Sequence, residues 1–210
     1  MQQFVGSLSF VGGVSSRFSI GAGTTLGLLP SSVSGSPRWL SVTTGGGQLT
    51  LGAGSFGGTA PSVIGMDAGS ALEVVDARWL GGTSTVFIAG NGNRLTYSGA
   101  GNAAFAGLLK FNSGIGSTNT VEVAPGAGTL ALTGKIEAGG SNLRIHGDGA
   151  GGSVVELGFT SGEFNRRLVL DSALVRITTQ RSVGAAGLES TSSAIQLATS
   201  LTLGAAQSVT

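Results

Sequence analysis

The stretch VEVAPGAGTLALTG, residues 121–134, decides the fold. Apolar side chains alternate with polar or small ones at Val121, Val123, Leu130 and Leu132, and a glycine-rich segment separates the two runs. Alternation with period two is typical of a strand with one buried face, and glycine suits tight corners because it tolerates positive φ. The stretch therefore predicts two short strands joined by a compact turn.

The same three-residue pattern recurs along much of the chain. It is found at 49–51, 72–74, 95–97, 109–111, 143–145, 155–157, 168–170, 175–177, 195–197 and 201–203. Its middle residue is usually polar, and we expect Glu122, Arg144, Glu156, Arg176 and Gln196 to point to water while their apolar neighbours point inward.

Two all-β architectures compete for such a pattern. A sandwich or barrel favours strands of about 5 to 10 residues with hairpin turns, whereas these strands are short and their corners consist of small residues. The sequence predicts an all-β fold, a single-stranded right-handed parallel β-helix with coils of roughly 20 to 25 residues stacked about 4.8 Å apart. Eight to ten coils, on the order of 40 to 50 Å in length, would account for the chain.

Composition supports this interpretation and excludes several classes of protein. Of 210 residues, 39 are glycine and only 10% are charged, which disfavours long helices and charge-driven disorder. The net charge of +1 gives no field for nucleic acid, and no apolar stretch is long enough to span a bilayer as a helix. We expect one continuous solenoid over residues 1–210, with residues 29–39, which contain two prolines, leaving the coil as a loop.

Several segments resemble the autotransporter-associated β-strand repeat of bacterial passenger domains. The resemblance is carried by PGAGTLALTG at 125–134, LVLDSALVRITT at 168–179, SVGAAG at 182–187 and AIQLATSLTLG at 194–204. It implies an exported right-handed β-helix that serves as a stalk, adhesin or scaffold. The chain starts without a signal-peptide pattern, so we expect an extracellular or cell-surface location reached through a signal that this sequence does not contain.

No motif with established chemistry is convincing, so we predict no catalytic, cofactor-binding or metal-binding residue. The only histidine, His146, has Asp148 as the nearest carboxylate in sequence and is expected at a surface corner. The glycine patterns at 52–57 and 147–152 lack the strand–helix context of a dinucleotide site. A single GDGAGG copy, with Asp148 as its one carboxylate, does not build a calcium site between turns.

One cluster keeps an enzymatic alternative open. Asp67, Glu73, Asp76 and Arg78 lie within twelve positions, and some β-helices cleave polysaccharides with paired carboxylates. Trp39 and Trp79, each preceded by arginine, could stack on sugar rings. We expect these residues to be solvated or structural.

The ends of the chain favour a structural role. QQFVGSLSFVGG at 2–13 and AIQLATSLTLGAAQSVT at 194–210 contain neither charge nor proline, the usual protections of an open sheet edge. We therefore predict a non-catalytic bacterial surface scaffold or adhesin that associates with itself end to end or laterally and contacts a glycan or host surface. The alternatives are a glycan-active enzyme centred on Asp67, Asp76 and Arg78, and a phage or secreted fibre segment.

Overall fold

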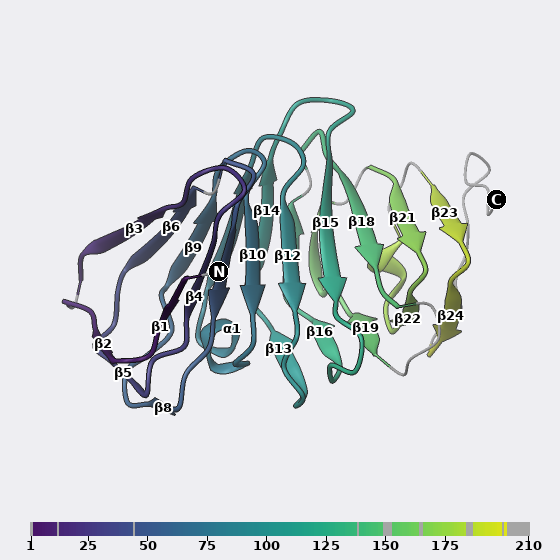
Figure 1. The fold of residues 1–210 in the computed structure, drawn as a ribbon. Helices are drawn as coiled ribbons and strands as arrows, with labels where there is room; N and C mark the ends of the chain where they lie inside the picture. Colours follow the sequence, from purple (N-terminus) through teal and green to yellow (C-terminus); the bar gives the residue numbers. More distant parts are fainter. Residues whose placement is uncertain are drawn as a thin grey trace.

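The computed structural model of the chain describes residues 2–11, 13–43, 45–137, 139–148, 153–163, 166–183, 187–198 and 200. They form a parallel β-solenoid of about eight turns, in which the chain advances along one axis from the N-terminal to the C-terminal coil (Figure 1). The predicted all-β parallel β-helix is confirmed.

The strands form four parallel sheets. The nine-stranded sheet contains β1 (Gln2–Phe4), β4 (Thr25–Leu28), β7 (Gln48–Leu51), β10 (Ala71–Val74), β12 (Arg94–Tyr97), β15 (Thr118–Val123), β18 (Asn142–His146), β21 (Leu168–Asp171) and β23 (Leu188–Thr191). The seven-stranded sheet contains β3 (Ser15–Ser19), β6 (Trp39–Thr43), β9 (Val63–Met66), β11 (Thr85–Ala89), β14 (Leu108–Asn112), β17 (Lys135–Glu137) and β20 (Ser161–Glu163). The three-stranded sheet contains β2 (Ser7–Ser9), β5 (Ser32–Ser34) and β8 (Ser55–Phe56), and the five-stranded sheet contains β13 (Ala103–Phe105), β16 (Leu130–Leu132), β19 (Val154–Leu157), β22 (Leu174–Ile177) and β24 (Ala194–Leu197). The short helices are α1 (Arg78–Gly81) and η1 (Gln180–Ser182).

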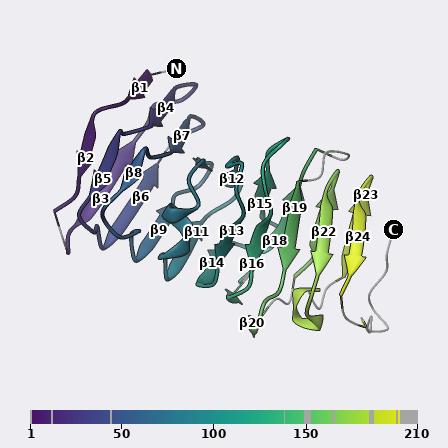
Figure 2. The ribbon, with the colours of Figure 1, turned by 90° about the horizontal axis from the view of Figure 1, so that it is seen from below.

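A typical coil gives one strand to the nine-stranded sheet, one to the three- or five-stranded sheet and one to the seven-stranded sheet, and Figure 2 shows the coils side by side. Register partners in the nine-stranded sheet are separated by 20 residues at the shortest coil and 26 at the longest. Leu26, Leu49, Leu72 and Leu95 follow one another at a strict spacing of 23. The predicted coil length is thus close, although this strict period was not predicted.

The segment 29–39, predicted to leave the coil as a loop, belongs to it instead. Its residues Ser32–Ser34 form β5, which pairs with β2 on one side and β8 on the other. Pro30 and Pro37 lie outside β5, at the corners before and after it. Proline has no backbone N–H to donate to a neighbouring strand, and a corner does not need this donor. The two prolines therefore mark the boundaries of β5 and not a loop that leaves the coil.

The core is the inside of the solenoid. The predicted apolar positions are buried, as at Leu130 and Ile145, which are both 0% exposed, while the intervening Arg144 is exposed and Glu122 and Glu156 are half-buried. Register pairing stacks equivalent side chains in columns, so each buried leucine packs on neighbours one coil above and below. Burial of one such side chain contributes roughly 1.5 to 3 kcal/mol.

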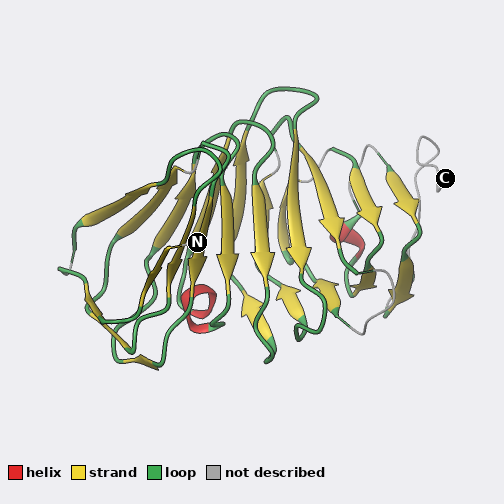
Figure 3. Cartoon of the chain, in the orientation of Figure 1, coloured by secondary structure: helices red, strands yellow, loops and turns green. Residues whose placement is uncertain are grey.

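Helix α1 replaces one strand of its coil, between β8 and β13 (Figure 3). It places Trp79 inside the solenoid, where the indole makes edge contacts with Phe10 at 6.2 Å and Phe56 at 5.1 Å between ring centroids. Its Nε1 donates to the Gly52 carbonyl at 3.4 Å. Trp79 is therefore a core residue that closes the gap between the three- and five-stranded sheets.

A ladder of buried polar side chains joins the corners before β10, β12 and β18 to the start of β15. The Oδ1 of Asn119 accepts hydrogen bonds from the backbone N–H and the Nδ2 of Asn93, both at 3.0 Å. Asn93 Oδ1 accepts from the Ser70 backbone at 3.0 Å, and Asn119 Nδ2 donates to Ser141 Oγ at 2.9 Å. Each amide thus satisfies buried groups of the adjacent coil, which fixes the register of the corners.

Candidate functional site

The structure separates Asp67 from Asp76, the two carboxylates at the centre of the alternative, glycan-active interpretation. Asp67 precedes β10 and Asp76 follows it, so the four residues of that strand, about 13 Å at 3.3 Å per residue, lie between them. Glycosidases need their two carboxyl groups roughly 5 to 9.5 Å apart. Glu73 lies on β10 itself and accepts a hydrogen bond from Gln48 Nε2 at 2.7 Å. Asp67 and Asp76 are therefore not brought into one site.

Asp76 and Arg78 instead pair with each other at the corner before α1. Arg78 Nε donates to both carboxylate oxygens, at 2.9 and 3.0 Å, and this hydrogen bonding holds the pKa of Asp76 below its usual value. The guanidinium also lies 5.4 Å from the ring centroid of Phe56. The pair closes the corner by a bidentate contact.

A hollow of about 310 Å³ adjoins this corner. It is lined by Ala53, Val75, Asp76, Ala77, Tyr97 and Gly101. The Tyr97 hydroxyl donates to the Gly101 carbonyl at 2.5 Å, and burial, together with the Asp76 charge, raises its pKa. The described lining holds one carboxylate, which is already paired, so the hollow lacks the second carboxylate of a glycosidase.

The two tryptophans have opposite environments. Trp79 is 0% exposed, so it cannot stack on a sugar, whereas Trp39 at the start of β6 is 38% exposed on the outer face of the seven-stranded sheet. Its indole leans over Gly65, where a Cβ would lie 2.7 Å from Nε1, and contacts Phe87 at 6.4 Å between centroids with the rings inclined by 61°. We call Trp39, Gly65 and Phe87 the aromatic platform.

A polar row accompanies the aromatic platform on the same sheet. Arg17 donates to Thr43 Oγ1 at 3.3 Å, Thr43 Oγ1 donates to Asp67 Oδ2 at 2.5 Å, and Arg17 lies 3.8 Å from Asp67. These residues come from three successive coils, and the two charged side chains are more than half exposed. We call Arg17, Thr43 and Asp67 the polar row.

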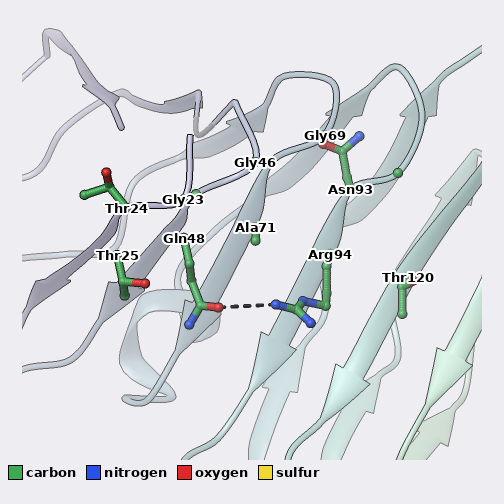
Figure 4. A pocket seen from close by; sticks show the side chains of 12 residues that line it. Gly23, Thr24, Thr25, Gly46, Gln48, Gly69, Ala71, Asn93, Arg94 and Thr120 are labelled. Carbon is green, nitrogen blue, oxygen red and sulfur yellow. Dashed lines mark hydrogen bonds between the residues drawn. The ribbon is translucent and has the colours of Figure 1, made fainter. Parts of the chain in front are cut away.

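An open groove of about 450 Å³ runs along the corners before the nine-stranded sheet (Figure 4). Its walls combine corner glycines with Thr24, Thr25, Gln48, Arg94 and Thr120. Figure 4 shows Gln48 and Arg94 reaching toward one another across the strand between them, with Arg94 Nη2 donating to Gln48 Oε1 at 3.3 Å. The described lining offers hydrogen bonds and one positive charge, but no nucleophile with a base beside it.

His146 lies on the outer face of β18, as predicted, but its carboxylate partner was not foreseen. Its Nδ1 is 3.1 Å from Oδ2 of Asp171 on the next coil, and Arg144 pairs with the same carboxylate. The Arg144 hydrogen bond, with smaller contributions from its charge and from His146, lowers the pKa of Asp171. Similar cross-coil charge pairs are Arg94–Glu122 on the same sheet and Arg176–Glu156 on the five-stranded sheet.

Within the described ranges, His, Asp and Glu side chains form no group of three that could hold a metal ion. Asp148 is described, whereas Gly149 to Gly152 of the GDGAGG motif lie outside the described residues. None of the helices in the described part of the chain has the length and apolar character of a bilayer-spanning segment.

Comparison with known proteins adds no functional assignment. No protein-family model, no curated protein and no solved structure matches the chain. The solenoid fold is shared by many functions, so function must be argued from the sites.

Sequence analysis missed the aromatic platform and the polar row. The signal that finds them is the coil length, because residues one coil apart are neighbours on a sheet face. Arg17, Thr43 and Asp67 are 26 and 24 residues apart, and Trp39 and Phe87 flank Gly65 on neighbouring strands. These spacings predict contacts only when the pairing register of the strands is known.

Proposed function

We propose that the chain is a non-catalytic structural scaffold of an exported bacterial surface protein, and that its N-terminal coil joins end to end with a second copy. The observation that carries the proposal is the edge formed by β1, β2 and β3. Each is the terminal strand of its sheet, and within the described residues no strand pairs with its outer side.

This edge lacks the usual protections. The three strands contain one charged residue, Arg17, and no proline. Four apolar side chains of the same coil are exposed: Phe4, Val5, Val11 and Val14. An edge strand beside exposed apolar side chains forms a template for another strand.

The geometry of such a contact decides whether a filament or a dimer forms. An N-terminal edge that joins the opposite end of a second copy makes a heterologous contact, which repeats into a filament, whereas two N-terminal edges facing each other close into a dimer. Either product buries the exposed apolar side chains of the first coil. The export and the adhesive role implied by the resemblance to autotransporter repeats are part of the same proposal.

The test compares two variants that add the same charge at different places. Ser9→Glu places a carboxylate on edge strand β2, whereas Ala104→Glu places it at an exposed position on β13 in the middle of the solenoid. We expect sedimentation velocity and negative-stain microscopy to show concentration-dependent filaments or dimers, which Ser9→Glu weakens at least about tenfold and Ala104→Glu leaves unchanged. Isolated rods at all concentrations, or equal behaviour of the two variants, would overturn end-to-end assembly. Ser208, at the opposite end of the chain, lies outside the described residues.

The glycan-active enzyme remains the second candidate from sequence, but no specific contact favours it. Asp76→Asn would abolish cleavage of a polysaccharide panel if that activity existed. The separation of Asp67 from Asp76 and the pairing of Asp76 with Arg78 lead us to expect no cleavage by either form.

A further inference from the structure

The aromatic platform interrupts a mainly polar outer face of the seven-stranded sheet. The other outward positions of β6 and of the strands beside it are mainly serine, threonine and small or half-buried apolar residues. A glycine inside a strand weakens the strand and often marks a close approach of another group. At Gly65 that group is the indole of Trp39, since any side chain at position 65 would collide with it.

Gly65 and Phe87 hold Trp39 in one orientation. The indole rests against the backbone on one side and meets the Phe87 ring in an inclined edge contact. A large aromatic surface is thus fixed before any ligand arrives, and 38% of the residue stays open to solvent. Such preorganisation reduces the entropy that binding must remove.

The polar row lies beside the aromatic platform. Ser41 and Gly65 occupy one outward column and Thr43 and Asp67 the next, so the columns are two residues, about 7 Å, apart. Arg17 reaches from the first column to Thr43 and Asp67 in the second. The row offers guanidinium donors and carboxylate acceptors at the margin of the aromatic surface, and its two charges cancel.

We propose that the aromatic platform and the polar row bind neutral polysaccharide. A pyranose has a face of C–H bonds that suits an aromatic ring and a rim of hydroxyls that suits paired donors and acceptors. The polar row carries no net charge, which favours a neutral sugar over an acidic one. Trp39 lines neither hollow described above and lies on an extended sheet, which suits a polymer lying across the surface.

This proposal does not rest on end-to-end assembly. The N-terminal edge involves β1, β2 and the open side of β3, whereas the aromatic platform involves β6, β9 and β11. In the polar row only Arg17 lies on β3, and its side chain reaches toward Thr43 and Asp67 of the following coils and not toward the open side. A scaffold that also binds glycan on its outer face would act as an adhesin. An experiment can disprove end-to-end assembly without disproving glycan binding, and the reverse.

The chain provides its own reporter, because Trp39 and Trp79 are its only tryptophans and Trp79 is fully buried. We would titrate the protein with laminarin, hydroxyethylcellulose, yeast mannan and soluble starch and follow tryptophan emission. We expect a saturable change with at least one of them. Trp39→Ala should weaken binding at least about tenfold, measured by affinity electrophoresis in gels containing that polysaccharide.

Two further variants keep the test decisive. Asp67→Asn removes the acceptor charge without touching Trp39 and should weaken binding about three- to tenfold. Leu108→Ala truncates an outward apolar residue on β14 of the same sheet, outside the aromatic platform, and should bind like the wild type. Circular dichroism and the unfolding midpoint check that each variant is folded, and if Trp39→Ala does not fold, Asp67→Asn decides.

Three results would overturn the proposal. The first is that none of the four polysaccharides changes the tryptophan emission or the electrophoretic mobility of the wild type. The second is that Trp39→Ala binds as the wild type does. The third is that Trp39→Ala lowers self-association in sedimentation while glycan binding is absent, which would make this face an interface between copies. A loss of assembly in Ser9→Glu with intact glycan binding would leave the proposal standing.

Discussion

Asn119 connects its coil to both neighbouring coils through the buried polar ladder. It is 0% exposed, and its Oδ1 is the acceptor for both the backbone N–H and the side-chain amide of Asn93. Its Nδ2 donates to Ser141 Oγ at 2.9 Å. Asn119→Ala removes this acceptor and this donor together from the solenoid interior.

The magnitude follows from what the substitution leaves behind. The backbone N–H of Asn93 loses its acceptor in a buried corner, which costs about 1 to 3 kcal/mol, and each lost cross-coil hydrogen bond adds about 0.5 to 1.5 kcal/mol. The Asn93 side chain keeps its bond to the Ala89 carbonyl at 2.8 Å, which limits the loss. We expect the free energy of unfolding to fall by about 3 kcal/mol.

Urea unfolding followed by circular dichroism measures the change. With a slope of about 2 to 3 kcal/mol per molar urea for a chain of this size, the midpoint should fall by roughly 1 M. Thr120→Ala is the matched control, since Thr120 is the next residue on β15 and points outward, and it should change stability by less than about 0.5 kcal/mol. Equal midpoints for the two variants would refute the view that the ladder fixes coil register.

Three further predictions concern the core, a close backbone contact and a charge pair. Leu72→Ala should lower the free energy of unfolding in urea by about 2 to 5 kcal/mol, because it opens a cavity in the inward column. A decrease below about 1 kcal/mol would show that the neighbouring side chains collapse into the cavity. Gly134→Ala should destabilise the chain, seen as a lower melting temperature, because the new Cβ collides with the Gly107 carbonyl; an unchanged melting temperature would mean that the coils move apart freely. Arg78 lowers the folded-state pKa of Asp76 below its unfolded value, so the stabilisation from this pair is present at neutral pH and is lost below about pH 4 as the carboxyl protonates. Asp76→Asn should therefore reduce the fall in the urea unfolding midpoint between about pH 6 and pH 3. The same fall in the variant and the wild type would contradict this assignment.

Local sequence was sufficient for the strands and their faces. Each described copy of the alternating pattern, from Leu49–Leu51 to Ile195–Leu197, lies within a strand, because period two and glycine corners are properties of a few adjacent residues. The copy at 201–203 lies outside the described residues. The N-terminal third, which lacks the resemblance to autotransporter repeats, obeys the strictest period, since Leu26, Leu49 and Leu72 keep a spacing of 23 while the intervening sequence changes.

Contacts between coils were not predictable without the register. The carboxylate nearest to His146 in sequence is Asp148, whereas its partner is Asp171, 25 residues away on the next strand. The sequence gives Trp39 and Trp79 the same expected role, because each follows an arginine. In the structure Trp39 begins strand β6, whereas Trp79 lies on the helical turn α1, which points its side chain inward. An error of one residue in coil length would exchange the two faces of every following strand, so the contacts depend on the sum of all coil lengths.

The same reasoning indicates where function can reside on such a fold. The interior columns are filled to stabilise the solenoid, and many outward charges of the described residues are neutralised by a partner one coil away, as in Arg144–Asp171. Binding capacity therefore remains at two kinds of place: a coil whose outer side pairs with no strand among the described residues, and a site on a face where the repeating surface is interrupted. The described residues contain one of each in the N-terminal edge and the aromatic platform over Gly65, and separate substitutions at Ser9 and Trp39 will show which of them the protein uses.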